Sequence, residues 1–158
     1  MQELGDWPTG KVGYVAIVGR PNVGKSTFLN ATLGYHLAAV SSCPQTTRRR
    51  WRGILSDDDS QIIFVDTPGV HEQNTRLGAF MLESVQRSLQ DADVVLCVCD
   101  GKRAPGAEDE MVTERVAAAG QPVILVVNKA DVATAEEQAE IRQFYTDRID
   151  GIFAQFAI

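Results

Sequence analysis

The segment GRPNVGKST, which starts at Gly19, follows directly after the apolar run VGYVAIV. It matches the pattern of two glycines separated by four residues and followed by a lysine and a hydroxyl residue. Glycines at this spacing let backbone N–H groups converge on phosphate oxygens, and the helix that follows directs its positive end at the same anion. The sequence therefore predicts a phosphate-binding loop, with Lys25 contacting the outer phosphates and Ser26 ligating Mg²⁺.

Short apolar runs alternate along the chain with helix-like segments. Strands are expected at 12–18, 48–55, 61–66, 93–99 and 122–127, the start of a last strand at 152–158, and helices at 25–33, 77–90, 108–119 and 135–148. Such alternation is typical of an α/β fold with a mostly parallel central sheet and helices on both faces. The polar turn at 57–60 is too short for a crossover, so its two strands should be antiparallel neighbours. With the phosphate-binding loop, this pattern predicts the P-loop NTPase fold with one antiparallel strand.

Polar residues stand where several of the predicted strands end. In parallel α/β sheets ligands bind beyond the carboxyl ends of the strands, so the glycine loop should meet Asp66, Asp100 and Asn128 on one rim. In the segment IIFVDTPG, Asp66 ends an apolar strand and can hold the hydration shell of Mg²⁺. Gly69 lacks a side chain, so its N–H can approach a γ-phosphate.

The tetrapeptide NKAD, from Asn128 to Asp131, follows the apolar run PVILVV. The Asp131 carboxylate can accept hydrogen bonds from the N1–H and the exocyclic amine of guanine, a pair that adenine does not offer. Asn128 can tether the loop or contact the base, and the stem of Lys129 can pack on the base plane. Because NKAD follows the two other motifs in order, it predicts GTP rather than ATP as the ligand.

Composition fits one globular domain, since 158 residues that are 44% hydrophobic can bury a sizeable core. The longest apolar runs are strand-length and far too short to span a bilayer. Cys97 and Cys99 share one strand-like run, and we expect both to be reduced core residues.

Charge is distributed unevenly. Residues 1–56 hold seven Lys/Arg and two Asp/Glu, giving +5, whereas residues 57–158 hold eight and nineteen, giving −11 and a net charge of −6. This acidity argues against a nonspecific nucleic-acid coat, but not against a local basic patch. The basic run Arg48–Arg52 has two interpretations: an RNA contact in which Trp51 stacks on a base, or a charged strand edge that resists pairing.

The three motifs in this order resemble the Era, Der and MnmE group of P-loop GTPases. Within the group, the loop AAVSSCPQTTRRR and the DTPGVH continuation are similar to the Era family, whereas the relatives favour GVTRD or GTTRD. The resemblance spans about residues 12–158 and implies a GTP-hydrolysing switch that assists assembly of the small ribosomal subunit and maturation of its rRNA. A Der- or MnmE-like GTPase in another RNA pathway is one alternative, and a non-hydrolysing nucleotide-binding scaffold is another.

The resemblance also implies roles for individual positions. It assigns nucleotide binding to Gly19, Arg20, Pro21, Asn22, Val23, Gly24, Lys25, Ser26, Thr27, Asp66, Thr67, Pro68, Gly69, Asn128, Lys129 and Asp131. Lys25, Thr47 and Gly69 would assist catalysis. Ser26, Thr47 and Asp66 would hold Mg²⁺.

Further positions bear on catalysis. Asn22 matches an asparagine that helps hold a K⁺ ion beside the phosphates in related enzymes. Val70 stands where many small GTPases have a glutamine that orients water, so catalysis would rest on phosphate electrostatics, a cation or a partner's group. The expected switch region consists of Gln45, Thr46, Thr47, Arg48 and Arg49.

Two features of the Era family have no match here. The family reads guanine with a further serine-alanine loop and continues into a KH domain that binds RNA, whereas this sequence stops at FAQFAI. We therefore expect residues 1–158 to be a truncated GTPase domain, or the ordered part of a longer protein. The small ribosomal subunit and its rRNA would then be bound mainly by a missing C-terminal domain. The resemblance also implies a cytoplasmic protein that associates peripherally with the inner face of the membrane.

Overall fold

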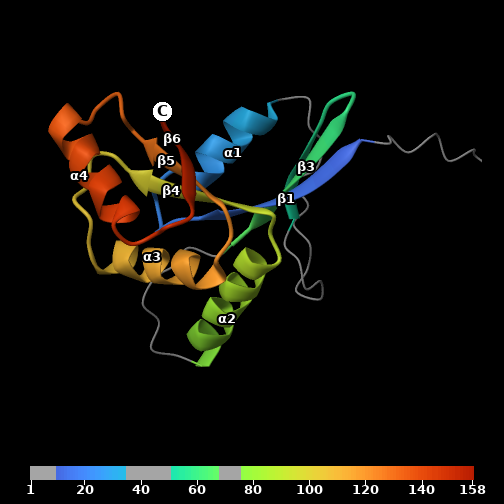
Figure 1. Ribbon diagram of the computed structural model, residues 1–158, viewed down its shortest axis with the longest axis horizontal. Coiled ribbons are helices and arrows are strands. Elements are labelled where there is room, and N and C mark those ends of the chain that lie inside the picture. The colour runs from blue at the N-terminus through green and yellow to red at the C-terminus, as the bar shows by residue number, and fades with distance from the viewer. Residues whose placement is uncertain (1–9, 35–50, 68–75) are drawn as a thin grey trace, which may run out of the picture.

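The computed structural model describes residues 10–34, 51–67 and 76–158, and for residues 51, 52, 66, 76–79 and 81 it describes the backbone alone. Helices and strands alternate through these residues (Figure 1). Their bounds are β1 (Lys11–Val18), α1 (Lys25–Leu33), β2 (Trp51–Ser56), β3 (Ser60–Asp66), α2 (Arg76–Gln90), β4 (Val94–Asp100), α3 (Ala107–Ala119), β5 (Val123–Asn128), α4 (Ala135–Thr146) and β6 (Ile152–Ala157).

The described strands form one sheet in the order β2-β3-β1-β4-β5-β6. β2 and β3 are antiparallel, and the other neighbours are parallel. The turn between β2 and β3 is closed by the carboxylate of Asp57, which accepts hydrogen bonds from the backbone N–H groups of Asp59 and Ser60. These two bonds and one from the Ser60 hydroxyl lower the pKa of Asp57. The predicted fold, with one antiparallel strand, is confirmed.

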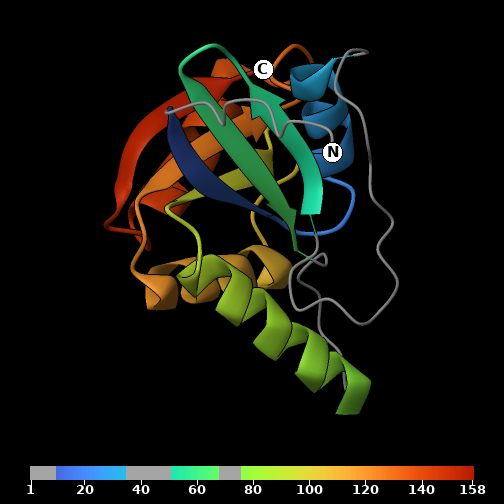
Figure 2. The ribbon, with the colours of Figure 1, turned by 90° about the vertical axis from the view of Figure 1, so that its right-hand side faces the viewer.

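Helices cover both faces of the sheet, as predicted. In both ribbon views α2 and α3 lie below the strands, whereas α1 lies above the strands in Figure 1 and at their upper right in Figure 2. The helices below pack on a core cluster that also includes α4 through Ile141 and Tyr145, whereas α1 packs on a second cluster through Leu29 and Leu33. In the part of the chain that the structure describes, no helix has the length and apolarity to cross a bilayer.

β4 separates the two clusters because successive side chains of a strand point to opposite faces. Val95, Cys97 and Cys99 belong to the cluster under α2, α3 and α4. Leu96 and Val98 belong to the cluster under α1. The continuous apolar run of β4 is therefore explained by its burial on both faces of the sheet.

The element bounds differ from the predicted ones at a few ends. α4 ends at Thr146 rather than at Arg148. The N–H of Ile149 still donates to the carbonyl of Tyr145, and the buried Ile149 side chain packs on the core as the chain turns towards β6. β6 is more than the start of a strand, since it pairs with β5 over Ile152–Ala157. Residues 48–50, predicted to begin β2, lie outside the described residues.

The two cysteines of β4 should resist alkylation in the native protein. Both are buried free thiols. Burial raises the pKa of Cys97 well above its ordinary value and raises the pKa of Cys99 to about 12. Because the thiolate is the reactive form, iodoacetamide at pH 8 should leave both unmodified until the protein is unfolded in denaturant. Peptide mass spectrometry checks this, and rapid native labelling of either residue would contradict the buried position of β4.

Candidate functional site

The loop between β1 and α1 has a backbone that only glycine allows at two positions. Gly24 has φ +98°, in the left-handed region, and a Cβ there would lie 2.2 Å from Nδ2 of Asn128. At Gly19 a Cβ would lie 2.3 Å from the backbone carbonyl oxygen of Val98. Both glycines therefore permit close approach, Gly19 to β4 and Gly24 to the residue that ends β5.

Lys25 and the first turn of α1 give this loop a positive character. The Lys25 Nζ donates to the backbone carbonyls of Gly19, at 2.8 Å, and Arg20, at 2.7 Å, so the ammonium lies against the loop. Ser26 and Thr27 are exposed in the first turn of α1, which contains no acidic residue. The helix dipole therefore acts on an anion at the loop without an opposing carboxylate in that turn.

Asn128 connects the NKAD segment to the phosphate-binding loop. Its Nδ2 donates to the carbonyl of Val23 at 2.8 Å, and its Oδ1 accepts from the N–H of Lys129 at 2.8 Å. Of the two roles considered for Asn128, the structure therefore contains the tether. The predicted phosphate-binding and base-binding segments meet on one rim as expected.

Lys129 and Asp100 form a contact that the sequence analysis did not predict. Lys129 has φ +61°, which costs energy for a residue with a side chain. Its Nζ reaches Oδ2 of Asp100 at 2.7 Å and the carbonyl of Asn22 at 3.3 Å. Burial alone would raise the pKa of Asp100, but the hydrogen bonds from Lys129 and from the backbone N–H of Lys102 outweigh it and lower that pKa. The sequence placed Asp100 at a strand end, and therefore on this rim, but it did not indicate that Lys129 would be its partner.

Arg20 also lies differently from what its place in the motif suggests. Its guanidinium is buried, and Nη1 contacts Oδ2 of Asp109 on α3 at 2.8 Å. The backbone of Arg20 is part of the loop and accepts from Lys25, but its side chain extends into the body of the protein. The remaining loop residues are half-buried Pro21, exposed Asn22, whose φ of +63° an asparagine tolerates, and buried Val23.

The other predicted site residues are described to different extents. Asp131 is exposed three residues beyond Asn128. Thr67 is buried, and its hydroxyl donates to the carbonyl of Ile17, which joins β3 to β1 near the rim. The backbone of Asp66 pairs with Ile17, but its side chain is not described. The predicted residues that lie outside the described residues are Gln45, Thr46, Thr47, Arg48, Arg49, Pro68, Gly69 and Val70.

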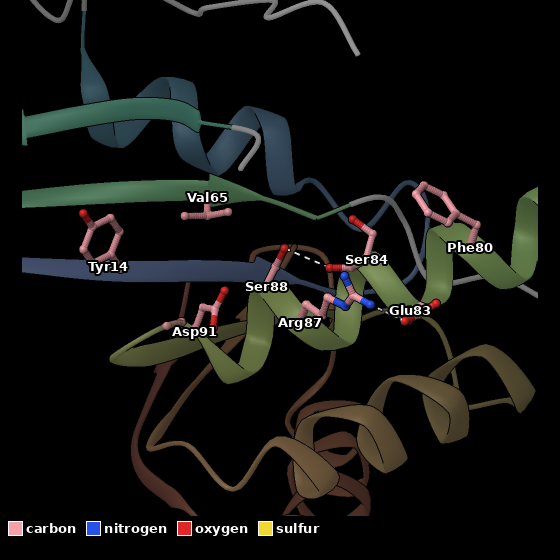
Figure 3. Close-up of a pocket in the computed structure, with 9 residues that line it drawn as sticks. Tyr14, Val65, Phe80, Glu83, Ser84, Arg87, Ser88 and Asp91 are labelled. Carbon is pink, nitrogen blue, oxygen red and sulfur yellow. Dashed lines mark hydrogen bonds and ion pairs between the residues drawn. The ribbon is translucent and has the colours of Figure 1, made fainter. Parts of the chain in front are cut away.

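A cavity of about 400 Å³ lies apart from this rim, between the sheet and α2. Figure 3 shows Tyr14 and Val65 on the strands and Phe80, Ser84 and Ser88 on α2 around it. Among the predicted nucleotide-binding residues whose side chains the structure describes, none lines this cavity. The candidate nucleotide site is therefore the rim formed by the glycine loop and the NKAD segment.

Comparison with known proteins agrees with this geometry. The family model described as 50S ribosome-binding GTPase matches residues 14–129. A crystal structure of Era in complex with MgGDPNP and nucleotides 1506–1542 of 16S ribosomal RNA is similar at 37% identity, with a TM-score of 0.74, over 94% of this chain and 51% of that one. A point variant of Aquifex aeolicus Era bound to GDP and AlF4⁻ is similar at 38% identity, with a TM-score of 0.73 and the same coverage.

A more distant similarity shows the fold alone. The G domain of the T. maritima iron transporter FeoB is 21% identical, with a TM-score of 0.57, over 92% of this chain and 87% of that one. The present chain spans about half the length of the two Era chains. Together with the family match over residues 14–129, the glycine loop and the tethered NKAD segment, these similarities show that the chain belongs to the family of ribosome-binding GTPases and contains an Era-like GTPase domain.

Proposed function

We propose that this domain binds GTP with Mg²⁺ and hydrolyses it to GDP and phosphate, and that it acts as the switch of an Era-type protein. The observation that carries the proposal is the 2.8 Å hydrogen bond between Asn128 and Val23, which holds a phosphate-binding loop beside the segment expected to bind guanine. The Era structures with MgGDPNP and with GDP and AlF4⁻ support the same ligands.

The residues on the rim fit the work of phosphoryl transfer. Loop N–H groups and Lys25 bind the phosphates and stabilise charge on the γ-phosphate oxygens while water attacks in line. In the structure the Lys25 ammonium lies within the loop and donates to the carbonyls of Gly19 and Arg20. Mg²⁺, when bound, neutralises charge on the β- and γ-phosphates, and Ser26 and Asp66 are the residues of the described segments that would hold it. With Val70 in place of a glutamine, K⁺ held by Asn22 is our proposed additional charge.

For the biological role we propose maturation of the small ribosomal subunit. The description of the matching family model names the large (50S) ribosomal subunit. The Era structure, however, which is similar over 94% of this chain, contains a piece of 16S rRNA, which belongs to the small subunit. Since this chain has a net charge of −6, we assign RNA recognition mainly to a C-terminal KH domain of the whole protein. From the resemblance to the Era family, we also propose that the protein is cytoplasmic and attaches peripherally to the membrane. A Der- or MnmE-like role is less well supported, because the two structures with 37% and 38% identity are Era.

Binding to RNA tests this division of labour. Residues 1–158 alone should bind a 3′-terminal 16S rRNA fragment weakly, and binding should fall steeply between two salt concentrations because only phosphate contacts are available. A 23S rRNA fragment of the same length is the control. Tight binding of this chain to the 16S fragment, with sequence preference, would place RNA recognition in the GTPase domain instead.

Base selectivity should depend on Asp131. In Asp131→Asn the side chain loses its acceptor pair for guanine and gains a donor for the second carbonyl of xanthine. The neutral amide oxygen can accept from only one of the two guanine donors, and the amide N–H₂ then faces the other donor. GDP binding should therefore weaken by about 100-fold or more, and XDP should be favoured. Titration with fluorescent GDP and XDP measures both affinities. Glu136→Gln, which neutralises an exposed carboxylate nearby on α4, is the matched control, and unchanged GDP preference in Asp131→Asn would refute the assignment.

Hydrolysis should be slow without a partner and should depend on Lys25. We expect single-turnover GTP hydrolysis at roughly 10⁻⁴ to 10⁻² s⁻¹ by analogy with unassisted GTPases. K⁺ should raise this rate above that in Na⁺ at equal ionic strength, and Lys25→Ala should lower it far more than Val70→Ala does. Phosphate release measures these rates. No hydrolysis by intact, GTP-bound protein would favour the scaffold alternative, and equal rates in the two salts would exclude the K⁺ role.

A further inference from the structure

A buried polar cluster, consisting of Arg20, Asp109 and Tyr145, connects the phosphate-binding loop to α3 and α4. These residues are 3%, 2% and 1% exposed. Arg20 Nη1 donates to Oδ2 of Asp109 at 2.8 Å, and the Tyr145 hydroxyl donates to Oδ1 of Asp109 at 2.6 Å. The members are 89 and 36 residues apart along the chain, so the cluster exists only in the folded domain.

Asp109 is the centre of this cluster because its two oxygens accept from three donors. Besides Arg20 and Tyr145, the backbone N–H of Gly106 donates to Oδ2 at 2.9 Å. Nε of Arg20 has no hydrogen-bond partner in the part of the chain that the structure describes. A buried guanidinium is costly unless it is paired, so its position depends strongly on Asp109.

The orientation of the cluster is fixed further by Tyr145. Burial above all, with the Asp109 carboxylate adding to it, raises the pKa of Tyr145, so the hydroxyl stays protonated and donates to Asp109. Tyr145 lies on α4, which follows the NKAD segment. The carboxylate of Asp109 is thus held from α4 while it holds Arg20.

Arg20 connects Asp109 to the phosphate-binding loop, because its side chain contacts Asp109 and its backbone is part of the loop. Its own backbone carbonyl accepts the hydrogen bond from Lys25 Nζ at 2.7 Å. On the other side of the loop, Asn128 holds the carbonyl of Val23. The Asn128 amide and the Lys129 ammonium therefore hold the carbonyls of Val23 and Asn22, and Asp109 holds the loop near its start through Arg20.

We propose that Asp109, supported by Tyr145, is a positioning residue for phosphate binding, which holds Arg20 so that the loop backbone and Lys25 keep the geometry that the phosphates require. The inference rests on the proposed function. Neither residue belongs to the NKAD segment that reads the base, so the cluster acts on the phosphates of the nucleotide and leaves the choice of base unchanged. A purely structural ion pair would instead affect the stability of the whole domain and spare the affinity of the folded protein.

The test compares GDP with IDP, which lacks the exocyclic amine that Asp131 would bind. Both Kd values are measured by calorimetry below the unfolding transition for the unaltered chain, Asp109→Asn and Tyr145→Phe. We expect Asp109→Asn to weaken the binding of both nucleotides by about tenfold or more, by analogy with groups that orient metal-ligating residues. Tyr145→Phe should weaken both by a smaller factor. The ratio of the two Kd values should stay as in the unaltered chain.

The matched control is Ile141→Val, since Ile141 is buried on the same helix and in the same core cluster as Tyr145 but has no polar group that could hydrogen-bond within the polar cluster. It should lower the melting temperature and leave the Kd for GDP unchanged. Tyr145→Phe removes a single oxygen, so it keeps the test decisive if Asp109→Asn does not fold. If the folded variants bind GDP as tightly as the unaltered chain, the inference is wrong but the proposed function stands. The same holds if the variants lose the preference for GDP over IDP, because the cluster would then act on the base. Failure of the unaltered chain to bind GDP would overturn the proposed function and the inference together.

Discussion

The hydrogen bond from Asn128 to the carbonyl of Val23 is the contact on which the arrangement of the rim depends. Asn128 ends β5, and Val23 belongs to the loop after β1, so one bond of 2.8 Å joins two segments that are 105 residues apart. The amide can come so close only because Gly24 has no side chain in its path. The sheet brings the strands to the same edge, and this contact then fixes the distance between the loop and the NKAD segment.

A second set of contacts adds charge to this frame. Lys129 adopts a left-handed backbone and extends its ammonium to Asp100 and to the carbonyl of Asn22. Backbone strain of this kind persists only where surrounding contacts fix the conformation. Here those contacts are the Asn128 side chain, which accepts from the Lys129 N–H, and the buried carboxylate at the end of β4. The loop, β4 and β5 are thereby connected by side chains as well as by the sheet.

The sequence predicted the fold well because the apolar runs of this chain are short, well separated and bounded by turn residues. β4 and β5 were predictable since strands buried on both faces need continuous apolar residues. The motifs predicted which segments meet, because parallel strands end on one edge. The partners of Arg20 and Lys129 were not predictable in the same way. Each pairing depends on how far a side chain reaches after the sheet has formed, and Asp109 lies on a helix face whose neighbours no local pattern specifies.

The contacts of the two loop glycines separate the residues that the fold requires from those that a ligand requires. A side chain at position 19 would collide with the backbone of Val98, and one at position 24 with Asn128. Selection for a stable fold alone would therefore keep both glycines in a descendant protein that no longer binds any nucleotide. Asp131 is exposed, so such a descendant could replace it at small cost. When related sequences are surveyed for lost activity, the aspartate is therefore an informative position, and the glycines are not.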